Sequence, residues 1–388
     1  MTLLELLKMA VARRASDLHL GVGLPPVLRV DGRLERTSSP ALDPKHLEGF
    51  LHEVTTPEQR GQLEASGQVD FSYGGAGLGR FRINVFRQRG TIAFAIRVIP
   101  TEVPSPDELG LPPALVTAAF SPKGLILVTG PAGSGKSTTL ASLVDTINRN
   151  AEVHIITLED PIEYLHRHRR SVVHQREVGT DTSSFAAGLR AALREDPDVI
   201  MIGEMRDLET IATAITAAET GHLVMATLHT IDTAQTVARI VDAFPAGQQN
   251  QVRVQLAGCL LAVAAQQLIP RADGRGRVAA FELLLCTPAA ANLIREGKLH
   301  QLGTVLETGG GLGMVTMRQS LEYLRDAGLI TEEEYLRRVR ALAGSAVSPG
   351  APAGGLGGGT GSPGRAMGAL GGGTGALRGG AGHARLAL

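Results

Sequence analysis

The residues GPAGSGKST at positions 130–138 match the pattern G-x-x-x-x-G-K-[ST]. They follow the apolar run LILVT and precede the helical stretch TTLASLVDTINR, which is the context that a phosphate-binding loop requires. Glycines let backbone N–H groups surround phosphates, Lys136 is expected to reach the β and γ oxygens, and the Ser137 hydroxyl is expected to ligate Mg²⁺. The alternative is a chance glycine-rich turn. The predicted nucleotide-binding residues are Gly130, Pro131, Ala132, Gly133, Ser134, Gly135, Lys136, Ser137 and Thr138.

Apolar runs that are typical of buried strands alternate with helical stretches on both sides of this motif. The runs are GLILVTG, VHIITLED, DVIMIGE and HLVMATLH. Such alternation predicts an α/β domain over residues 114–344, with a mainly parallel sheet covered by helices. A last helical pair, which includes TEEEYLRRVRALAG, is expected to close it.

A small α+β domain is predicted for residues 1–98. The N-terminal segment has apolar residues at helical spacing, PPVLRVDGRLER indicates a hairpin turned at positions 31 and 32, and FRINVFRQRGTIAFAIRVI indicates two strands joined near residues 88–90. GGAGLG at residues 74–79 lies between strands and is expected to be a hairpin loop. The proline-rich, acidic residues 99–113 are the expected interdomain linker.

Composition limits the remaining possibilities. Residues 345–388 consist mostly of Gly, Ala, Ser and Pro, and we expect a disordered tail because they cannot bury enough apolar surface to offset the entropy of ordering. Lys plus Arg and Asp plus Glu both number 38, so no bulk charge indicates a nucleic-acid partner. The chain has no apolar run of about eighteen residues, and its two cysteines, Cys259 and Cys286, are expected to be buried free thiols.

Acidic residues follow two of the predicted strands. ITLEDPIEY contains Glu159, Asp160 and Glu163, and DPDVIMIGEMRD contains Glu204. Because ligands of open α/β sheets lie beyond the carboxyl ends of the strands, we expect these acids to converge on the phosphates held by Lys136. One would polarise the attacking water and another would hold Mg²⁺. The alternative is that they are solvated loop residues or helix caps.

Two histidines flank another predicted strand, TGHLVMATLHT at residues 220–230. A spacing of seven separates the rings by roughly 10 Å on a helix and roughly 23 Å on a strand, so His222 and His229 are not expected to share a metal. Two arginines, Arg190 and Arg194, lie four residues apart on one predicted helical face and are candidates to approach the phosphates. The alternatives are structural histidines and solvated arginines.

These motifs together resemble those of a known superfamily. ASDLHL at residues 15–20, GPAGSGKST, ITLEDPIEY, DPDVIMIGEMRD and TGHLVMATLHT occur in the order and spacing of the secretion ATPases. NLIREGKLHQ at residues 292–301 and GMVTMRQSL at residues 313–321 further resemble the twitching-motility retraction ATPases of type IV pili. The resemblance covers residues 1 to about 343.

The resemblance implies a homohexameric, Mg²⁺-dependent, ATP-hydrolysing motor that drives pilus retraction. Each subunit would have a PAS-like N-terminal domain and a RecA-like P-loop ATPase domain. The motor would be cytoplasmic, at the inner face of the cytoplasmic membrane, which it would contact only through partners. The expected partners are further copies of the chain, an inner-membrane pilus platform protein and a paralogous retraction ATPase.

The resemblance also assigns roles to single residues. Glu163 would be the catalytic base, and Glu204 the Walker B acid that holds Mg²⁺ directly or through a water molecule. His222 and His229 would line the nucleotide site and couple the γ-phosphate to the neighbouring subunit. Arg82 and Arg97 match best the N-domain arginines that reach a neighbour's nucleotide.

Three alternative functions stay open. Extension and type II secretion ATPases resemble one another in a four-cysteine zinc insertion, which two cysteines cannot form. A non-hydrolysing regulatory subunit is disfavoured by the intact Lys136, Glu163 and Glu204. Retraction ATPases carry AIRNLIRE where this chain has AAANLIRE, with Ala291 in place of the arginine, so a retraction-accessory paralogue is the third alternative.

Overall fold

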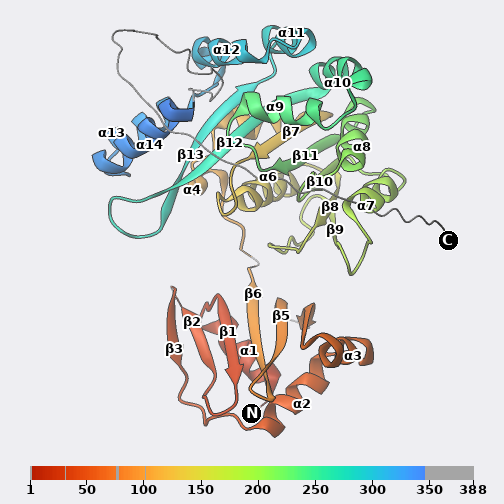
Figure 1. Cartoon of the computed structure of the whole chain (residues 1–388), viewed down its shortest axis with the longest axis vertical. Coiled ribbons are helices and arrows are strands. Elements are labelled where there is room, and N and C mark those ends of the chain that lie inside the picture. The colour runs from red at the N-terminus through yellow and green to blue at the C-terminus, as the bar shows by residue number, and fades with distance from the viewer. Residues whose placement is uncertain (1, 31, 76–77, 101, 346–388) are drawn as a thin grey trace, which may run out of the picture. The chain divides into compact units, whose positions relative to one another are not determined.

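The computed structural model describes residues 2–30, 32–75, 78–100 and 102–345. The tail expected at residues 345–388 therefore lies almost entirely outside the described residues. Two separate sheets organise the described part of the chain (Figure 1). Among the described residues, no helix combines the length and the apolarity needed to cross a bilayer.

The first sheet contains six strands in the order β3-β2-β1-β6-β5-β4, and every neighbouring pair is antiparallel. Both predicted hairpins are confirmed, as β2 with β3 and as β5 with β6. Three helices accompany the sheet: α1 (Leu3–Ala12), α2 (Pro44–Val54) and α3 (Pro57–Ser66). The strands are β1 (Asp17–Gly21), β2 (Val27–Val30), β3 (Arg33–Arg36), β4 (Gln68–Gly75), β5 (Gly79–Gln88) and β6 (Thr91–Ile99).

Strand β5 shows why this sheet forms. Phe81, Ile83 and Val85 are fully buried on one face, while Arg80 and Arg82 occupy the other face. The expected linker is less irregular than its prolines suggest. It contains the short helix α4 (Pro106–Leu109), capped by Ser105, and ends where α5 (Pro113–Ala118) begins.

The second sheet contains seven strands in the order β13-β12-β7-β11-β10-β8-β9. All neighbouring pairs are parallel except β12 with β13, so the predicted mainly parallel sheet is confirmed. Its strands are β7 (Gly124–Thr129), β8 (His154–Glu159), β9 (Val172–Glu177), β10 (Val199–Ile202), β11 (Leu223–Leu228), β12 (Leu260–Pro270) and β13 (Arg277–Leu285).

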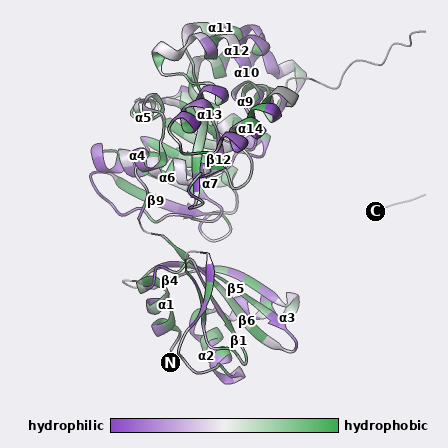
Figure 2. Cartoon of the chain, turned by 90° about the vertical axis from the view of Figure 1, so that its left-hand side faces the viewer, coloured by the Kyte–Doolittle hydropathy of each residue, from purple (hydrophilic) through white to green (hydrophobic). Residues whose placement is uncertain are grey.

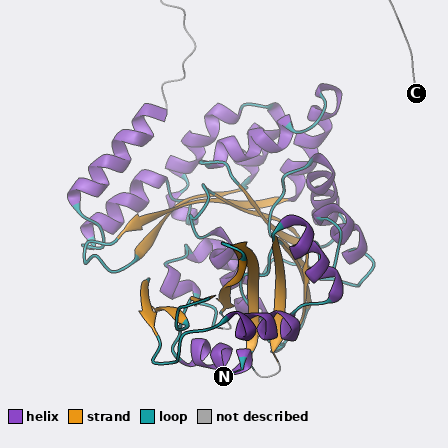
Figure 3. Ribbon diagram, turned by 60° about the horizontal axis from the view of Figure 1, so that its bottom comes forward, coloured by secondary structure: helices purple, strands orange, loops and turns teal. Residues whose placement is uncertain are grey.

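Helices cover this sheet on both faces (Figure 3). The longer ones between strands are α6 (Lys136–Asn150), α7 (Phe185–Ala192), α8 (Leu208–Glu219), α9 (Thr233–Asp242) and α10 (Ala246–Cys259). The segment after β13 contains α11 (Pro288–Glu296), η1 (Leu299–Gln301), α12 (Leu302–Thr308), η2 (Gly310–Leu312), α13 (Met317–Asp326) and α14 (Glu332–Ser345). The last two helices confirm the predicted closing pair.

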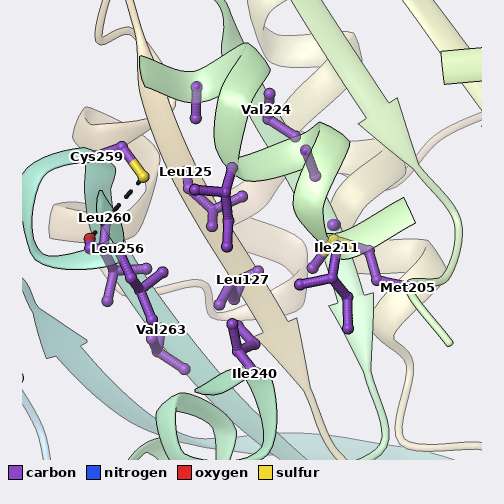
Figure 4. Packing of buried hydrophobic residues seen from close by; sticks show 14 of the residues in the cluster. Leu125, Leu127, Met205, Ile211, Val224, Ile240, Leu256, Cys259, Leu260 and Val263 are labelled. Atoms are coloured by element: carbon purple, nitrogen blue, oxygen red, sulfur yellow. Dashed lines mark hydrogen bonds between the residues drawn. The ribbon is translucent and has the colours of Figure 1, made fainter. Parts of the chain in front are cut away.

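The two faces of β7 belong to two different hydrophobic clusters. Leu125 and Leu127 pack with α8, α9 and α10, as Figure 4 shows, whereas Ile126 and Val128 pack with α6 on the other side. Burial on both faces explains why this strand has an unbroken apolar sequence. Figure 2 shows both hydrophobic and hydrophilic residues on the helices, as expected for helices with one buried and one exposed face.

Both cysteines are free thiols, as predicted. Cys259 is buried in the cluster of Leu125, and Cys286 is partly buried beside it. Burial raises the pKa of Cys259 to about 12 and that of Cys286 to about 11. Both thiols are therefore protonated near neutral pH.

Candidate nucleotide-binding site

The predicted phosphate-binding loop joins β7 to α6, so its expected strand-loop-helix context is confirmed. Two of its glycines have no room for a side chain. A Cβ on Gly130, where φ is 146°, would lie 2.3 Å from the carbonyl oxygen of Gln266. A Cβ on Gly135, where φ is 89°, would lie 2.9 Å from the Nε2 atom of Gln266. The loop is thus folded tightly against β12.

Lys136 is the first residue of α6 and is buried at the base of this loop. Its Nζ atom donates to the carbonyl oxygens of Gly130 and Pro131, at 2.8 Å and 3.1 Å, and lies 3.5 Å from Nδ1 of His229. Burial lowers the pKa of Lys136, while the charges of Glu204 and Glu163 oppose this effect. The ammonium group therefore lies among the acids that the sequence predicted to converge on it.

A cavity of about 240 Å³ lies over the loop, and the four predicted acids Glu159, Asp160, Glu163 and Glu204 all line it. Glu163 accepts a hydrogen bond of 2.9 Å from the Ser137 hydroxyl. The convergence follows from topology, because β8, β10 and β11 are adjacent parallel strands whose carboxyl ends share one edge. The four acids and Lys136 therefore line one cavity, and their convergence on bound phosphates stays a prediction.

Glu159 and Glu204 lie in different electrostatic surroundings. Burial raises the pKa of Glu159, although Thr157 and Gln175 donate hydrogen bonds to its carboxylate. Burial also acts to raise the pKa of Glu204, but hydrogen bonds and charge from Arg206 and His229 outweigh it and lower that pKa. Glu204 is therefore an ionised acid at the cavity wall.

The two predicted histidines, His222 and His229, lie at opposite ends of β11. His229 follows β11 and lines the cavity, where its Nε2 atom lies 2.8 Å from Glu204. His222 precedes β11, at the opposite end of the strand, and its Nδ1 atom lies 3.0 Å from the carbonyl oxygen of Ala217. Within one chain only His229 fulfils the expectation of lining the site, because a six-residue strand separates the two rings.

The four arginines predicted to approach phosphates have other partners in the chain. Arg82 lies 3.9 Å from Asp70, and Arg97 donates to Asp17 at 3.1 Å. Arg190 pairs with Glu209, and Arg194 donates to the carbonyl oxygen of Arg190. None of the four belongs to the described residues that line the cavity, so their action on a neighbouring subunit's nucleotide stays a prediction.

Several residues at or beside the cavity were missed from the sequence, and three of them bear on its chemistry or support. Arg206 lines the cavity and pairs with Glu204. Tyr164 also lines it, and its hydroxyl lies 3.2 Å from that of Thr138. Gln266 of β12 lies against the loop glycines Gly130 and Gly135 and accepts a hydrogen bond from Thr139 of α6. Arg206 and Tyr164 stand within the quoted motifs, so their position was available as a signal, whereas nothing local marks Gln266.

The site has the donors that a polyphosphate with Mg²⁺ requires. The Ser134 hydroxyl is buried within the loop and has no hydrogen-bond partner among the described residues, which suits an acceptor oxygen brought by a ligand. The Ser137 hydroxyl and the carboxylate of Glu204 are oxygen ligands of the kind that Mg²⁺ prefers. The residues of the cavity therefore fit both a nucleotide polyphosphate and a Mg²⁺ ion.

A glycine loop between a parallel strand and a helix, with a buried lysine and converging acids, defines a P-loop nucleotide-binding protein. Comparison with known proteins identifies its family. Residues 80–302 match the model of the Type II/IV secretion system protein family, and the chain belongs to that family.

Relatives within this family are similar over most of the chain. The chain is 47% identical over 340 residues to the type IV pilus retraction ATPase PilT of Pseudomonas aeruginosa, covering 88% of this chain and 98% of that protein. It is 42% identical over 332 residues to the type IV pilus ATPase PilU of the same organism, covering 86% and 87%. The predicted resemblance to retraction ATPases is confirmed.

A solved structure supports the same relationship. The crystal structure of the pilus retraction motor PilT with bound ADP has a TM-score of 0.80 and 50% identity to this chain. The similarity covers 87% of this chain and 96% of that one.

Proposed function

We propose that this chain is a Mg²⁺-dependent ATPase that powers type IV pilus retraction. The observation that carries the proposal is the convergence of Lys136, Ser137, Glu163 and Glu204 on one cavity, in a chain similar to retraction ATPases over most of its length. Lys136 would bind the β- and γ-phosphates, and the backbone N–H groups of the loop would surround them.

The chain's own residues divide the remaining tasks. Mg²⁺, held by Ser137 and by Glu204 directly or through water, would neutralise charge on the β- and γ-phosphates. Glu163 would accept the proton of the attacking water, and its position beside Ser137 supports this role. Glu159 would keep the backbone of this segment in place, since its carboxylate accepts from the N–H group of Glu163 at 3.3 Å.

The finer architecture belongs to the same proposal. The two sheets would be a PAS-like and a RecA-like domain, and six copies would form a ring. Arg82 and Arg97 would then approach a neighbouring subunit's nucleotide, and His222 would contribute to the contact between subunits. The motor would act in the cytoplasm, at the inner face of the membrane, against a platform protein.

Ala291 supports a second candidate, the retraction-accessory paralogue. It lies on α11, partly buried against the cluster of Leu125, at the position where retraction ATPases are expected to carry arginine. The similarity to the pilus ATPase PilU is also extensive. Deletion of the gene separates the functions: excess non-retracting pili support retraction, bald cells support extension, and normal retraction with reduced force supports the accessory role.

The enzymatic part is tested by two substitutions at the cavity. Lys136→Ala is expected to abolish tight nucleotide binding, whereas Glu163→Gln is expected to retain binding and to lose turnover by about 10² to 10⁴. Nucleotide affinity and ATPase rate are measured for both, with Glu152→Gln as a control because Glu152 is exposed and paired with Arg170. Equal losses of affinity in the two cavity variants would remove Glu163 from the catalytic role.

A further inference from the structure

Arg206 has a firmly held backbone on both sides. The N–H group of Met205 donates to the carbonyl oxygen of Thr227 at 3.1 Å, and the Met205 side chain is buried. Asp207 caps α8, and its carboxylate accepts from the N–H group of Thr210 at 2.8 Å. The direction in which the Arg206 side chain leaves the backbone is therefore set by the fold.

The side chain of Arg206 is mostly exposed to solvent. It lines the nucleotide cavity, yet 74% of its surface is exposed. Its partner is Glu204, with a further favourable charge from Asp160. The guanidinium side of this ion pair is exposed, whereas the Glu204 side chain is only 17% exposed. Solvent around the guanidinium weakens the pairing, so another anion can compete for Arg206.

The balance of charges around the cavity indicates a role for Arg206. Its wall carries four carboxylates, but Lys136 and Arg206 are the permanent cations among the described residues that line it. A nucleotide polyphosphate adds further negative charge, which Mg²⁺ and Lys136 offset only in part. The planar guanidinium of arginine is also better suited than an ammonium group to bind two phosphate oxygens at once.

We propose that Arg206 is a second phosphate-binding cation of the same subunit, which exchanges its pairing with Glu204 for phosphate oxygens when nucleotide binds. The proposal rests on the proposed function, since it takes this cavity to be the ATP site. The exchange removes one of the two side-chain partners of the Glu204 carboxylate and leaves His229 as the other. Nucleotide binding would in this way change the surroundings of the proposed Walker B acid.

A double-substitution experiment separates this role from simple pairing with Glu204. Affinity for a fluorescent ADP analogue is measured by anisotropy, with Mg²⁺ and with EDTA, for Arg206→Ala in the natural chain and in a Glu204→Gln background. Loss of a charge-assisted hydrogen bond predicts a weakening of about tenfold or more. Because the analogue contacts Arg206 directly, the weakening is expected in both backgrounds, and Arg206→Lys should recover part of it.

Two comparisons make the outcome decisive. Arg149→Ala is the matched control, since Arg149 pairs with Asp145 on α6 and does not line the cavity, and it should leave affinity unchanged. Unchanged affinity of Arg206→Ala in the Glu204→Gln background would overturn the proposal, because Arg206 would then act only through Glu204. Suppose that the natural chain binds the analogue and Lys136→Ala does not: the proposed function then stands even if the Arg206 proposal is overturned. If the natural chain does not bind the analogue, the proposed function and the Arg206 proposal both fail. Thermal midpoints within about a degree of the natural chain show that each variant is folded.

Discussion

The hydrogen bond between Thr139 and Gln266 offers a quantitative test of how β12 supports the phosphate-binding loop. The Thr139 hydroxyl donates to Oε1 of Gln266 at 2.7 Å, and the two residues are only 1% and 3% exposed. In the sheet, Ala265 pairs with Thr129, so Gln266 lies beside the first loop residue, Gly130. The bond therefore joins α6 to β12 directly beneath the loop.

The size of the effect follows from burial. Removing one partner leaves a buried polar group unpaired, which destabilises by about 1–3 kcal/mol, whereas replacing both with apolar groups of similar shape is nearly neutral. Thr139→Val should cost about 2 kcal/mol because it leaves the buried Oε1 atom of Gln266 without its hydrogen-bond donor. Gln266→Met should cost about 1 kcal/mol, since a helical threonine hydroxyl can turn to the carbonyl of the preceding turn.

The double variant is expected to be more stable than the sum of the two single losses by about 1 kcal/mol or more. Thermal midpoints of the four proteins measure this coupling, at about 2–4 °C per kcal/mol for a domain of this size. Nucleotide affinity should weaken in both single variants, because the loop loses its support. Thr146→Val is the control, since Thr146 donates to Ser142 on the same helix and should not couple with Gln266→Met. Strictly additive losses for Thr139 and Gln266 would refute the reasoning.

Two further predictions concern acid stability and the ring. Burial lowers the pKa of His166 from 6.5 to about 4. Its contribution to the free energy of unfolding is therefore complete above about pH 6.5 and is lost as the pH falls towards 4. The total loss is about 3 kcal/mol, at about 1.4 kcal/mol per pH unit. Denaturant unfolding between pH 7 and pH 5 should show a flatter profile for His166→Gln, and an unchanged slope would contradict this origin. Arg82→Ala and Lys136→Ala should each be inactive, and mixed rings of the two should recover ATPase activity because some interfaces combine an intact arginine with an intact loop. Verified mixed rings without recovered activity would count against a site shared between subunits.

Whether the sequence predicted a strand of the second sheet depended on how completely that strand is buried. β7, β8, β10 and β11 lie inside the sheet with both faces covered, and their continuous apolar sequences identify them. β9 was missed because it is the edge strand, and its sequence VVHQRE exposes Val172 and His174 to solvent. β12 was missed because three alanines and two glutamines lie in the middle of LLAVAAQQLIP and weaken its strand signal. Its place between β7 and β13 makes it a strand.

By itself, the sequence determined the parts of the site that are local in the chain. The loop from Gly130 to Lys136 works through neighbouring residues, since glycine torsions and the start of α6 are properties of one short segment. Only the tertiary structure decided which distant groups meet there: Glu163 against Ser137, His229 and Arg206 against Glu204, and Gln266 beneath the loop. The same structure kept His229 in the cavity and placed His222 at the far end of β11. Strand patterns place the acids at one edge of the sheet, but the individual pairings depend on the order in which the strands assemble, which long-range packing sets.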